Sequence, residues 1–416
     1  MRHALKTLYR HQFFSLSAGV AAANVLSLVA MPFLAGIYGA ESFGAFGVFF
    51  AITTIMGTFT TLRLDQAVPI AENDGERTAL SQIAFMSSLT LCTAFSVMWI
   101  AFDCGALLSV PTDRVFPITA AFASILVALL NIQTTIAIKY GNLRSISLRY
   151  FTEKVTTLLA AFIIFRKTPI YGLIFSQIMG YAASALTLTI GTGNRLFRRT
   201  DWKNFPPLAM LYKYRDFPLH NGLSNLFQIL QMQAPALIFS TLFPLSMLGY
   251  YNLAQRIIEA PNAIVGSALG TVFYRRMLHA QKTELSRIYR RTMLWAGIVV
   301  LLPMLLVAIF SVPIVRAVFG KEWTPAAIFF VLLLPAASMR MLYFVAQNCF
   351  IILRRLDFGM KILASSLVAT LLGVGIGSWR FSSMEVAVFI ASAGAAVILL
   401  IGLWTIDVEL RTVGKV

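Results

Sequence analysis

The sequence predicts an all-α polytopic membrane protein with about twelve transmembrane helices in two six-helix bundles. Its composition is 58% hydrophobic and only 12% charged, whereas soluble domains are roughly 25% charged and carry that charge on their surface. Apolar runs of about 18 or more residues, which are long enough to cross a bilayer as a helix, recur along the whole chain. A basic segment in the middle of the sequence separates these runs into two groups.

Hydropathy places the expected spans in order along the chain. The first apolar run, from Phe13 to Ile37, exceeds the roughly 7–15 residues of a cleavable signal, so we expect it to remain as the first span. The least apolar span begins with Arg149, Glu153 and Lys154. The predicted spans lie near residues 14–37, 44–62, 79–102, 115–138, 149–165, 170–190, 217–241, 246–270, 292–317, 325–352, 357–378 and 384–404.

The basic residues indicate how the chain is oriented. Short cytoplasmic loops of membrane proteins carry an excess of Lys and Arg. With the N-terminus inside, most of the 34 Lys and Arg residues fall in the N-terminus, the inner loops and the C-terminus. We therefore expect both termini in the cytoplasm. The basic residues predicted on the outer side are Arg114, Arg166, Lys167, Arg316, Lys321 and Arg380.

The net charge of +17 indicates membrane lipids as partners. The basic residues of the chain are spread over short loops that anionic headgroups can contact. A nucleic-acid surface would instead need a patch or an arm. No Cys/His cluster has the spacing of metal ligands, and no phosphate-binding loop of an ATPase is present. We expect no metal and no bound cofactor.

The chain divides into three segments. We expect an N-terminal bundle at 1–190, a basic cytoplasmic linker at 191–216, and a C-terminal bundle at 217–416.

The two bundles resemble each other weakly in sequence. "SFGAF" at 42–46 matches "MLGYY" at 247–251, and "ALSQI" at 79–83 matches "ELSRI" at 284–288 with the same offset. Chance similarity between apolar segments is the alternative explanation. Repeated bundles are typical of secondary transporters, which handle their substrate near the midplane.

Polar side chains form stripes in three spans of the second half. Each of the first two stripes covers roughly 120° of its helix. A charged residue at a helix centre costs about 2.5–3.5 kcal/mol and normally faces a cavity or a partner. The stripes consist of Asn221, Ser224, Asn225, Gln228 and Gln231 in 217–241, Asn252, Gln255, Arg256, Glu259 and Asn262 in 246–270, and Arg340, Tyr343 and Gln347 in 325–352.

These stripes favour a polar cavity at the centre of the protein. Single Asn or Gln residues more often form hydrogen bonds between helices, but five on one face, beside a charged face, favour a lined space. Arg256 and Glu259 are three residues apart and can pair on one helix. Few acids oppose the deep cations Arg256 and Arg340. A positive cavity suits an anion, and arginine matches phosphate through paired hydrogen bonds.

One segment carries a family resemblance. The stretch "IYGAESFGAFGVFFAITTIMGTFTTLRLDQAVPIAENDGER" at 37–77 is similar to the opening of the bacterial polysaccharide-transporter branch, the O-antigen flippase type. This branch belongs to the multidrug/oligosaccharidyl-lipid/polysaccharide exporter superfamily. The chain departs from the pattern in having Leu64 for an aromatic residue and Asp65 where Glu is commoner. The matching residues are Tyr38, Phe43, Gly44, Arg63, Asp65 and Ala67.

The resemblance implies a non-enzymatic flippase of the bacterial inner membrane with a cationic central cavity. Its cargo would be a polyprenyl-diphosphate-linked oligosaccharide for O-antigen, capsule or exopolysaccharide synthesis, moved from the inner to the outer leaflet by alternating access. We expect Arg256 and Arg340 to receive the diphosphate or acidic sugars, and the Asn/Gln stripe to solvate sugar hydroxyls. Coupling to a proton or sodium gradient through Glu259 or Asp65 stays open. The expected partners are a polysaccharide polymerase and chain-length proteins, with the transporter itself a monomer.

Arg63 and Asp65 are the expected gating residues at the cytoplasmic mouth. On a regular helix they lie about 200° apart and cannot share a face. Asp65 then continues the polar face of Thr54, Thr58 and Thr61 towards the cavity entrance. Arg63 either extends to the headgroups or turns inward if the helix loosens before Pro69.

Two other functions remain as alternatives. A multidrug extruder would share the superfamily but would not need a positive cavity. A membrane polysaccharide polymerase or glycosyltransferase commonly carries a large outer domain or a catalytic acidic pair in an outer loop. The longest outer loop predicted here is only about residues 103–114, which disfavours an enzyme.

Overall fold

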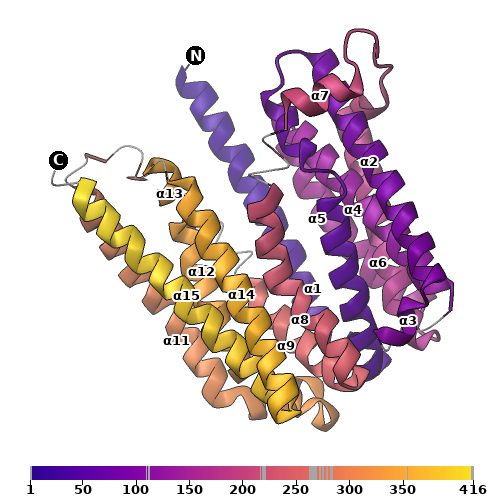
Figure 1. Ribbon diagram of the computed structural model, residues 1–416, viewed down its shortest axis with the longest axis vertical. Coiled ribbons are helices and arrows are strands. Elements are labelled where there is room, and N and C mark those ends of the chain that lie inside the picture. The colour runs from indigo at the N-terminus through magenta and orange to yellow at the C-terminus, as the bar shows by residue number, and fades with distance from the viewer. Residues whose placement is uncertain are drawn as a thin grey trace. The chain divides into compact units, whose positions relative to one another are not determined.

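The computed structural model confirms an all-α, multi-pass membrane fold (Figure 1). It describes residues 2–108, 110, 113–215, 217, 222–261, 269–270, 273, 276–277, 280–281, 284–353 and 355–413. Within these ranges every regular element is a helix. Eight of the described helices are long and apolar enough to cross a membrane.

The chain forms two compact units, which we describe separately. Unit 1 comprises Met1–Ile229 with Pro244–Ser246, and unit 2 comprises Leu230–Phe243 with Met247–Val416. The long helices of unit 1 are α1 (Arg2–Phe59), α2 (Asp74–Ala101), α4 (Val115–Lys139), α5 (Leu143–Leu159) and α6 (Pro169–Thr192), with the short α3 (Cys104–Leu107) and α7 (Pro207–Lys213). The second half of the chain contributes α8 (Leu223–Leu242), α9 (Leu245–Pro261), α11 (Leu285–Phe319), α12 (Ala326–Ala346), α13 (Cys349–Ile352), α14 (Leu356–Phe381) and α15 (Met384–Val413).

Helix α1 contains the first two predicted spans. Its backbone leaves the helical conformation at Gly39, with φ 71° and ψ 173°, a region that glycine adopts without steric cost. This break lies between the predicted spans 14–37 and 44–62. Helices α5 and α9 have only 17 residues each, and α8 carries the Asn/Gln stripe, so these three are not among the eight apolar helices.

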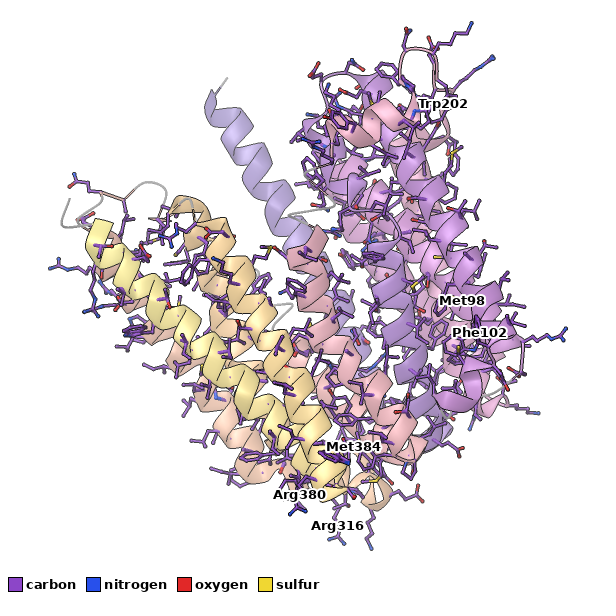
Figure 2. The ribbon with its side chains drawn as sticks, in the orientation of Figure 1. Met98, Phe102, Trp202, Arg316, Arg380 and Met384 are labelled. Atoms are coloured by element: carbon purple, nitrogen blue, oxygen red, sulfur yellow. The ribbon has the colours of Figure 1, made fainter. Side chains whose placement is uncertain are left out.

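In unit 1, helices α1, α4, α5 and α6 pack against one another, and α2 packs on α4. The segment that we expected to be a linker, 191–216, packs on this unit. Leu196, Met210 and Tyr214 join a buried cluster with Leu64 and Leu80. Helix α7 lies across one end of the unit (Figure 1). Trp202, in the same segment, lies at that end, and Phe102 lies towards the other (Figure 2).

In unit 2, helices α12, α14 and α15 form the central packing, and α11 packs on α12. Glycines allow α14 and α15 to approach closely, because a Cβ added at Gly373 would lie 2.5 Å from the Cα of Ala391. Small residues at helix interfaces permit such contacts inside membranes. Arg316 and Arg380 lie at the same end of this unit (Figure 2).

Candidate functional site

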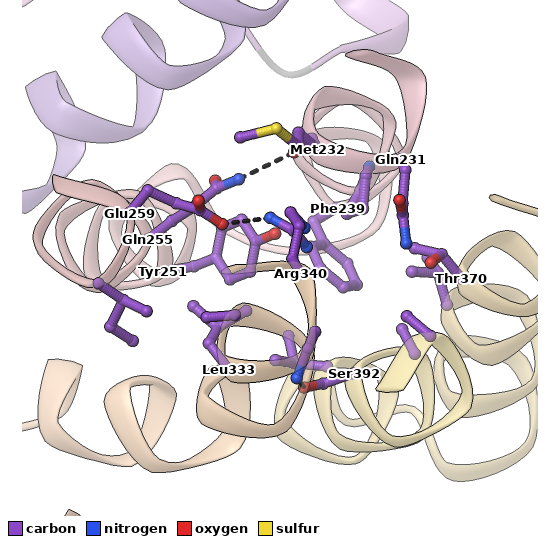
Figure 3. Close-up of a pocket in the computed structure, with 18 residues that line it drawn as sticks. Gln231, Met232, Phe239, Tyr251, Gln255, Glu259, Leu333, Arg340, Thr370 and Ser392 are labelled. Atoms are coloured by element: carbon purple, nitrogen blue, oxygen red, sulfur yellow. Dashed lines mark hydrogen bonds and ion pairs between the residues drawn. The ribbon is translucent and has the colours of Figure 1, made fainter. Parts of the chain in front are cut away.

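A polar cavity lies inside unit 2, between α8, α9, α12, α14 and α15 (Figure 3). Its volume is about 490 Å³, including its open side. Most of its wall is apolar, as in small-ligand sites generally. The polar side chains that line it are Gln231, Gln255, Glu259, Arg340, Thr370 and Ser392.

An ion pair between two helices dominates the electrostatics of this cavity. Arg340 of α12 donates a hydrogen bond from Nη1 to Oε1 of Glu259 on α9. Their side chains are only 13% and 17% exposed. The Nε of Arg340 is buried and has no hydrogen-bond partner within the part of the chain that the structure describes. Arg340 therefore keeps donor capacity beyond its pairing with the acid.

Two glutamines tie the surrounding helices together. Gln255 donates from Nε2 to the backbone carbonyl of Met232, at 2.9 Å, and so joins α9 to α8. Gln231 donates to the hydroxyl of Ser366 on α14. Pro235 also lines the cavity, and it cannot donate to the carbonyl of Gln231 one turn earlier. The carbonyl of Gln231 therefore lacks the intrahelical donor that another residue at position 235 would provide.

Hydroxyl groups from α14 and α15 complete the polar lining, and the sequence analysis did not identify them. Thr370 donates to the carbonyl of Ser366 at 2.8 Å. Ser392 accepts the backbone N–H of Ala336 at 3.1 Å. Ser366 and Thr370 are four residues apart on one helix face, which was the available signal, but isolated hydroxyls are common in membrane helices.

The structure brings together four of the predicted site residues: Gln231, Gln255, Glu259 and Arg340. The other predicted residues that the structure describes do not line this cavity. Tyr343 is a core residue, because its ring is buried and its hydroxyl donates to the carbonyl of Gly359 at 3.4 Å. The remaining predicted residues are Asn225 and Gln228 on the part of α8 in unit 1, Asn252 and Arg256 on α9, and Gln347 at the end of α12. Asn221 and Asn262 lie outside the described residues.

The predicted gating residues lie in unit 1, in a turn that follows α1. Leu62 and Arg63 both adopt left-handed backbone conformations, with φ 51° and 53°. This turn places the Nη1 of Arg63 at 3.9 Å from the Oδ2 of Asp65. The separation expected on a regular helix does not apply here, because the helix ends at Phe59 and the turn redirects the chain, as in the alternative in which the helix loosens before Pro69.

The periodicity predicted that Asp65 points towards the cavity entrance. In the structure its side chain does not point into an open space. Its side chain is fully buried. The hydroxyl of Thr61 lies 2.9 Å from Oδ1, and the Nε2 of Gln66 donates to Oδ2 at 3.0 Å. The carboxylate therefore organises the turn through its neighbours.

Comparisons with known proteins agree with this architecture. Residues 33–328 match the family described as "Polysaccharide biosynthesis protein". No curated protein matches the chain in sequence.

Solved structures show the same fold at low sequence identity. An inward-facing multidrug resistance MATE family transporter of the MOP superfamily has a TM-score of 0.73 at 15% identity, over 94% of this chain and 96% of that chain. The lipid II flippase MurJ, in an inward closed conformation, has a TM-score of 0.69 at 12% identity, over 96% and 91%. A mutant of the Vibrio cholerae MATE transporter VcmN has a TM-score of 0.59 at 14% identity, over 99% and 98%. By its sequence match, the chain belongs to the polysaccharide biosynthesis protein family.

Proposed function

We propose that this protein is a flippase for a polyprenyl-diphosphate-linked oligosaccharide in the bacterial inner membrane. It moves the cargo from the inner to the outer leaflet for surface polysaccharide synthesis, by alternating access and with both termini in the cytoplasm. Family membership supports a role in polysaccharide biosynthesis. The fold is shared with the lipid II flippase, which supports translocation of a lipid-linked cargo.

The observation that carries the proposal is the donor-rich wall of the cavity in unit 2. Arg340, Gln231 and Gln255 present guanidinium and amide donors inside a membrane helix bundle. Guanidinium groups suit phosphate oxygens, and amides suit sugar hydroxyls. In this proposal the diphosphate and the adjoining sugar contact these donors from the open side of the cavity, while the prenyl chain stays in the lipid.

Coupling to an ion gradient is part of the same proposal. Glu259 is an ionisable acid that lines this cavity, and Asp65 is a buried acid at the turn in unit 1. Protonation of Glu259 would remove the charge that pairs with Arg340 and leave the guanidinium to the cargo. The transporter would act as a monomer beside a polymerase and chain-length proteins.

A multidrug extruder is the second candidate. The similarity to a multidrug resistance transporter, with a TM-score of 0.73, favours it, and Glu259 gives the cavity an acid that a cationic drug could approach. The two candidates differ in the charge that the cavity must hold. An anionic cargo needs Arg340, whereas a cationic drug needs Glu259.

Complementation of a strain that lacks its own flippase tests the proposal. Surface polysaccharide should appear with the native chain and disappear with Arg340→Ala, which removes the guanidinium that lines the cavity. Arg316→Ala, at an exposed arginine of α11, should retain export and serves as the matched control. Full export by Arg340→Ala would refute the anionic site. Drug resistance that depends on Glu259, without any polysaccharide export, would establish the multidrug function instead.

A further inference from the structure

A second group of buried charges lies in unit 1, on α5, and none of the functions above uses it. Arg149 and Glu153 are both buried on this helix, and Lys154 lies beside them. Arg149 and Glu153 are four residues apart and so lie on the same helix face. The group lies more than one turn inside a helix that packs tightly on α6.

Glu153, the acid of this group, accepts hydrogen bonds from Lys154 and from a residue of α6. Lys154 donates from Nζ to the Oε1 of Glu153 at 2.9 Å. Gln177 of α6 donates to the same oxygen at 3.5 Å. The group contains two cations and one anion, so one positive charge remains.

Arg149 carries that excess charge inside the protein. Its side chain contacts the neighbouring Tyr150 ring, with Cζ 4.2 Å from the ring centroid. The residue is only 8% exposed. Its Nε and Nη1 are buried and have no hydrogen-bond partner among the described residues. The cation–π contact leaves both of these N–H groups without an acceptor.

A buried cation with unsatisfied donors is costly. An unpaired charge loses several kcal/mol of hydration, and such groups normally pair or bind a ligand. Two ordinary explanations fail here. A solvated arginine would be exposed. The charge of Arg149 acts on the Glu153 carboxylate, but the hydrogen bonds of that carboxylate come from Lys154 and Gln177, and the Nε and Nη1 of Arg149 bond to neither of its oxygens. Among the described residues the two N–H groups therefore lack an acceptor, and a ligand could supply one.

We propose that Arg149 and Lys154 form an anion site in unit 1 that takes a phosphate-class oxyanion. Arginine supplies planar, always charged donors that match phosphate oxygens, and Lys154, with its side chain 25% exposed, gives access from outside. Glu153 neutralises part of the positive charge and so lowers the affinity for the anion. The site is separate from the cavity in unit 2, and it does not depend on which cargo is exported.

Binding measurements on the purified full-length chain test this site. Inorganic pyrophosphate is titrated by calorimetry into the protein in neutral detergent, and farnesyl diphosphate is titrated in a parallel series. Binding of both that Arg149→Gln weakens identifies the phosphate group as the ligand of this site, whereas such binding of farnesyl diphosphate alone identifies a lipid headgroup. The matched control is Arg144→Gln, because Arg144 is an exposed arginine on the same helix.

The variants should shift the dissociation constant in opposite directions. Arg149→Gln should weaken binding about tenfold or more, because a hydrogen bond to a charged group is worth about 1.5–3 kcal/mol and about 1.4 kcal/mol is a factor of ten. Lys154→Gln should weaken binding less. Glu153→Gln should tighten it, since the opposing charge is removed.

The opposite signs keep the test decisive even if Arg149→Gln fails to fold. In that case Lys154→Gln and Glu153→Gln decide the outcome alone. The proposal is wrong if neither diphosphate binds, or if Arg149→Gln binds as tightly as Arg144→Gln. It is also wrong if Lys154→Gln and Glu153→Gln shift the affinity in the same direction or leave it unchanged.

Discussion

The guanidinium of Arg63 lies 3.9 Å from the carboxylate of Asp65, although two residues of regular helix would place them on opposite sides. Two consecutive left-handed residues, Leu62 and Arg63, bring them together. Left-handed conformations cost roughly 1–2 kcal/mol per residue for side chains other than glycine. The hydrogen bonds of the fully buried Asp65 carboxylate to Thr61 and Gln66 offset this cost.

The first prediction concerns this carboxylate. Asp65→Asn keeps the shape of the side chain but removes the charge that faces Arg63 and accepts from Gln66. We expect the free energy of unfolding to fall by about 1–3 kcal/mol, the cost of leaving buried polar groups unsatisfied. Thermal unfolding in detergent measures this change. An additional Arg63→Gln substitution should restore part of the loss, because the unpaired cation is also removed.

Asp103→Asn is the matched control for Asp65→Asn. Asp103 is exposed and left-handed, and Asn tolerates this conformation as well as Asp does. We expect its unfolding temperature to equal that of the native chain. If Asp65→Asn and Asp103→Asn lowered the unfolding temperature equally, the Asp65 contacts would not stabilise the turn.

The second prediction concerns the ion pair between Arg340 and Glu259. Glu259→Gln leaves a mostly buried guanidinium without its counter-charge, and breaking a buried pair costs about 3–5 kcal/mol. We expect a clear loss of thermal stability from this single change. Replacing both residues by Met should recover most of the stability but no export, because the cavity then lacks the guanidinium that an anionic cargo needs.

Glu322→Gln provides the comparison, since Glu322 is an exposed acid of the same unit. It should leave stability and export unchanged. Native export by the double Met variant would rule out a role for this pair in transport. A double variant that is no more stable than Glu259→Gln would show that the single loss does not come from an unpaired charge.

The membrane spans could be predicted from hydropathy because lipid exposure requires apolar side chains along each helix. The helix ends could not, because backbone hydrogen bonding continues beyond the apolar run. Helix α2 starts at Asp74, where Asn73 caps it by accepting the N–H of Glu76 at 2.8 Å, whereas the apolar run begins near residue 79. Helix α11 likewise begins at Leu285, before the predicted start at 292.

The candidate site was predictable only along single helices. Periodicity placed Gln231, Gln255 and Glu259 on polar faces, and these residues do line the cavity. It could not predict that Glu259 would pair with Arg340 of another helix. Periodicity also could not exclude Tyr343 from the cavity lining. Tyr343 lies one turn from Arg340 yet packs in the core, and periodicity does not reveal which neighbouring helix covers a face.

The third prediction uses the charges that hold α7 on unit 1. The Nζ of Lys213 lies 2.7 Å from Glu76 and 3.0 Å from Glu72. These hydrogen bonds, Glu76 first, raise the pKa of Lys213 above its ordinary value. A raised pKa gives stability that is fully present below the ordinary lysine value of about 10.4 and is lost as the pH rises through the folded-state pKa.

Lys213→Gln should therefore lower the unfolding temperature by a constant amount between about pH 7 and pH 10. The difference from the native chain should shrink at higher pH. Lys203→Gln, at an exposed lysine of the same segment, should show no such difference. If the difference in unfolding temperature between Lys213→Gln and the native chain widened above pH 10, this electrostatic account would be contradicted.

The fourth prediction separates the structural part of the family motif from its functional part. A Cβ added at Gly44 would lie 2.0 Å from the backbone oxygen of Leu245, so no side chain fits without moving α1 from the start of α9. Gly44→Ala should therefore lower the free energy of unfolding by roughly 1–3 kcal/mol or more, the cost typical of overpacking. Gly36, on the same helix, has nothing within 4 Å of an added Cβ, and Gly36→Ala should be neutral or stabilising by about 0.5–1 kcal/mol. Thermal unfolding of both variants measures the contrast, and a Gly44→Ala variant as stable as Gly36→Ala would refute this packing role.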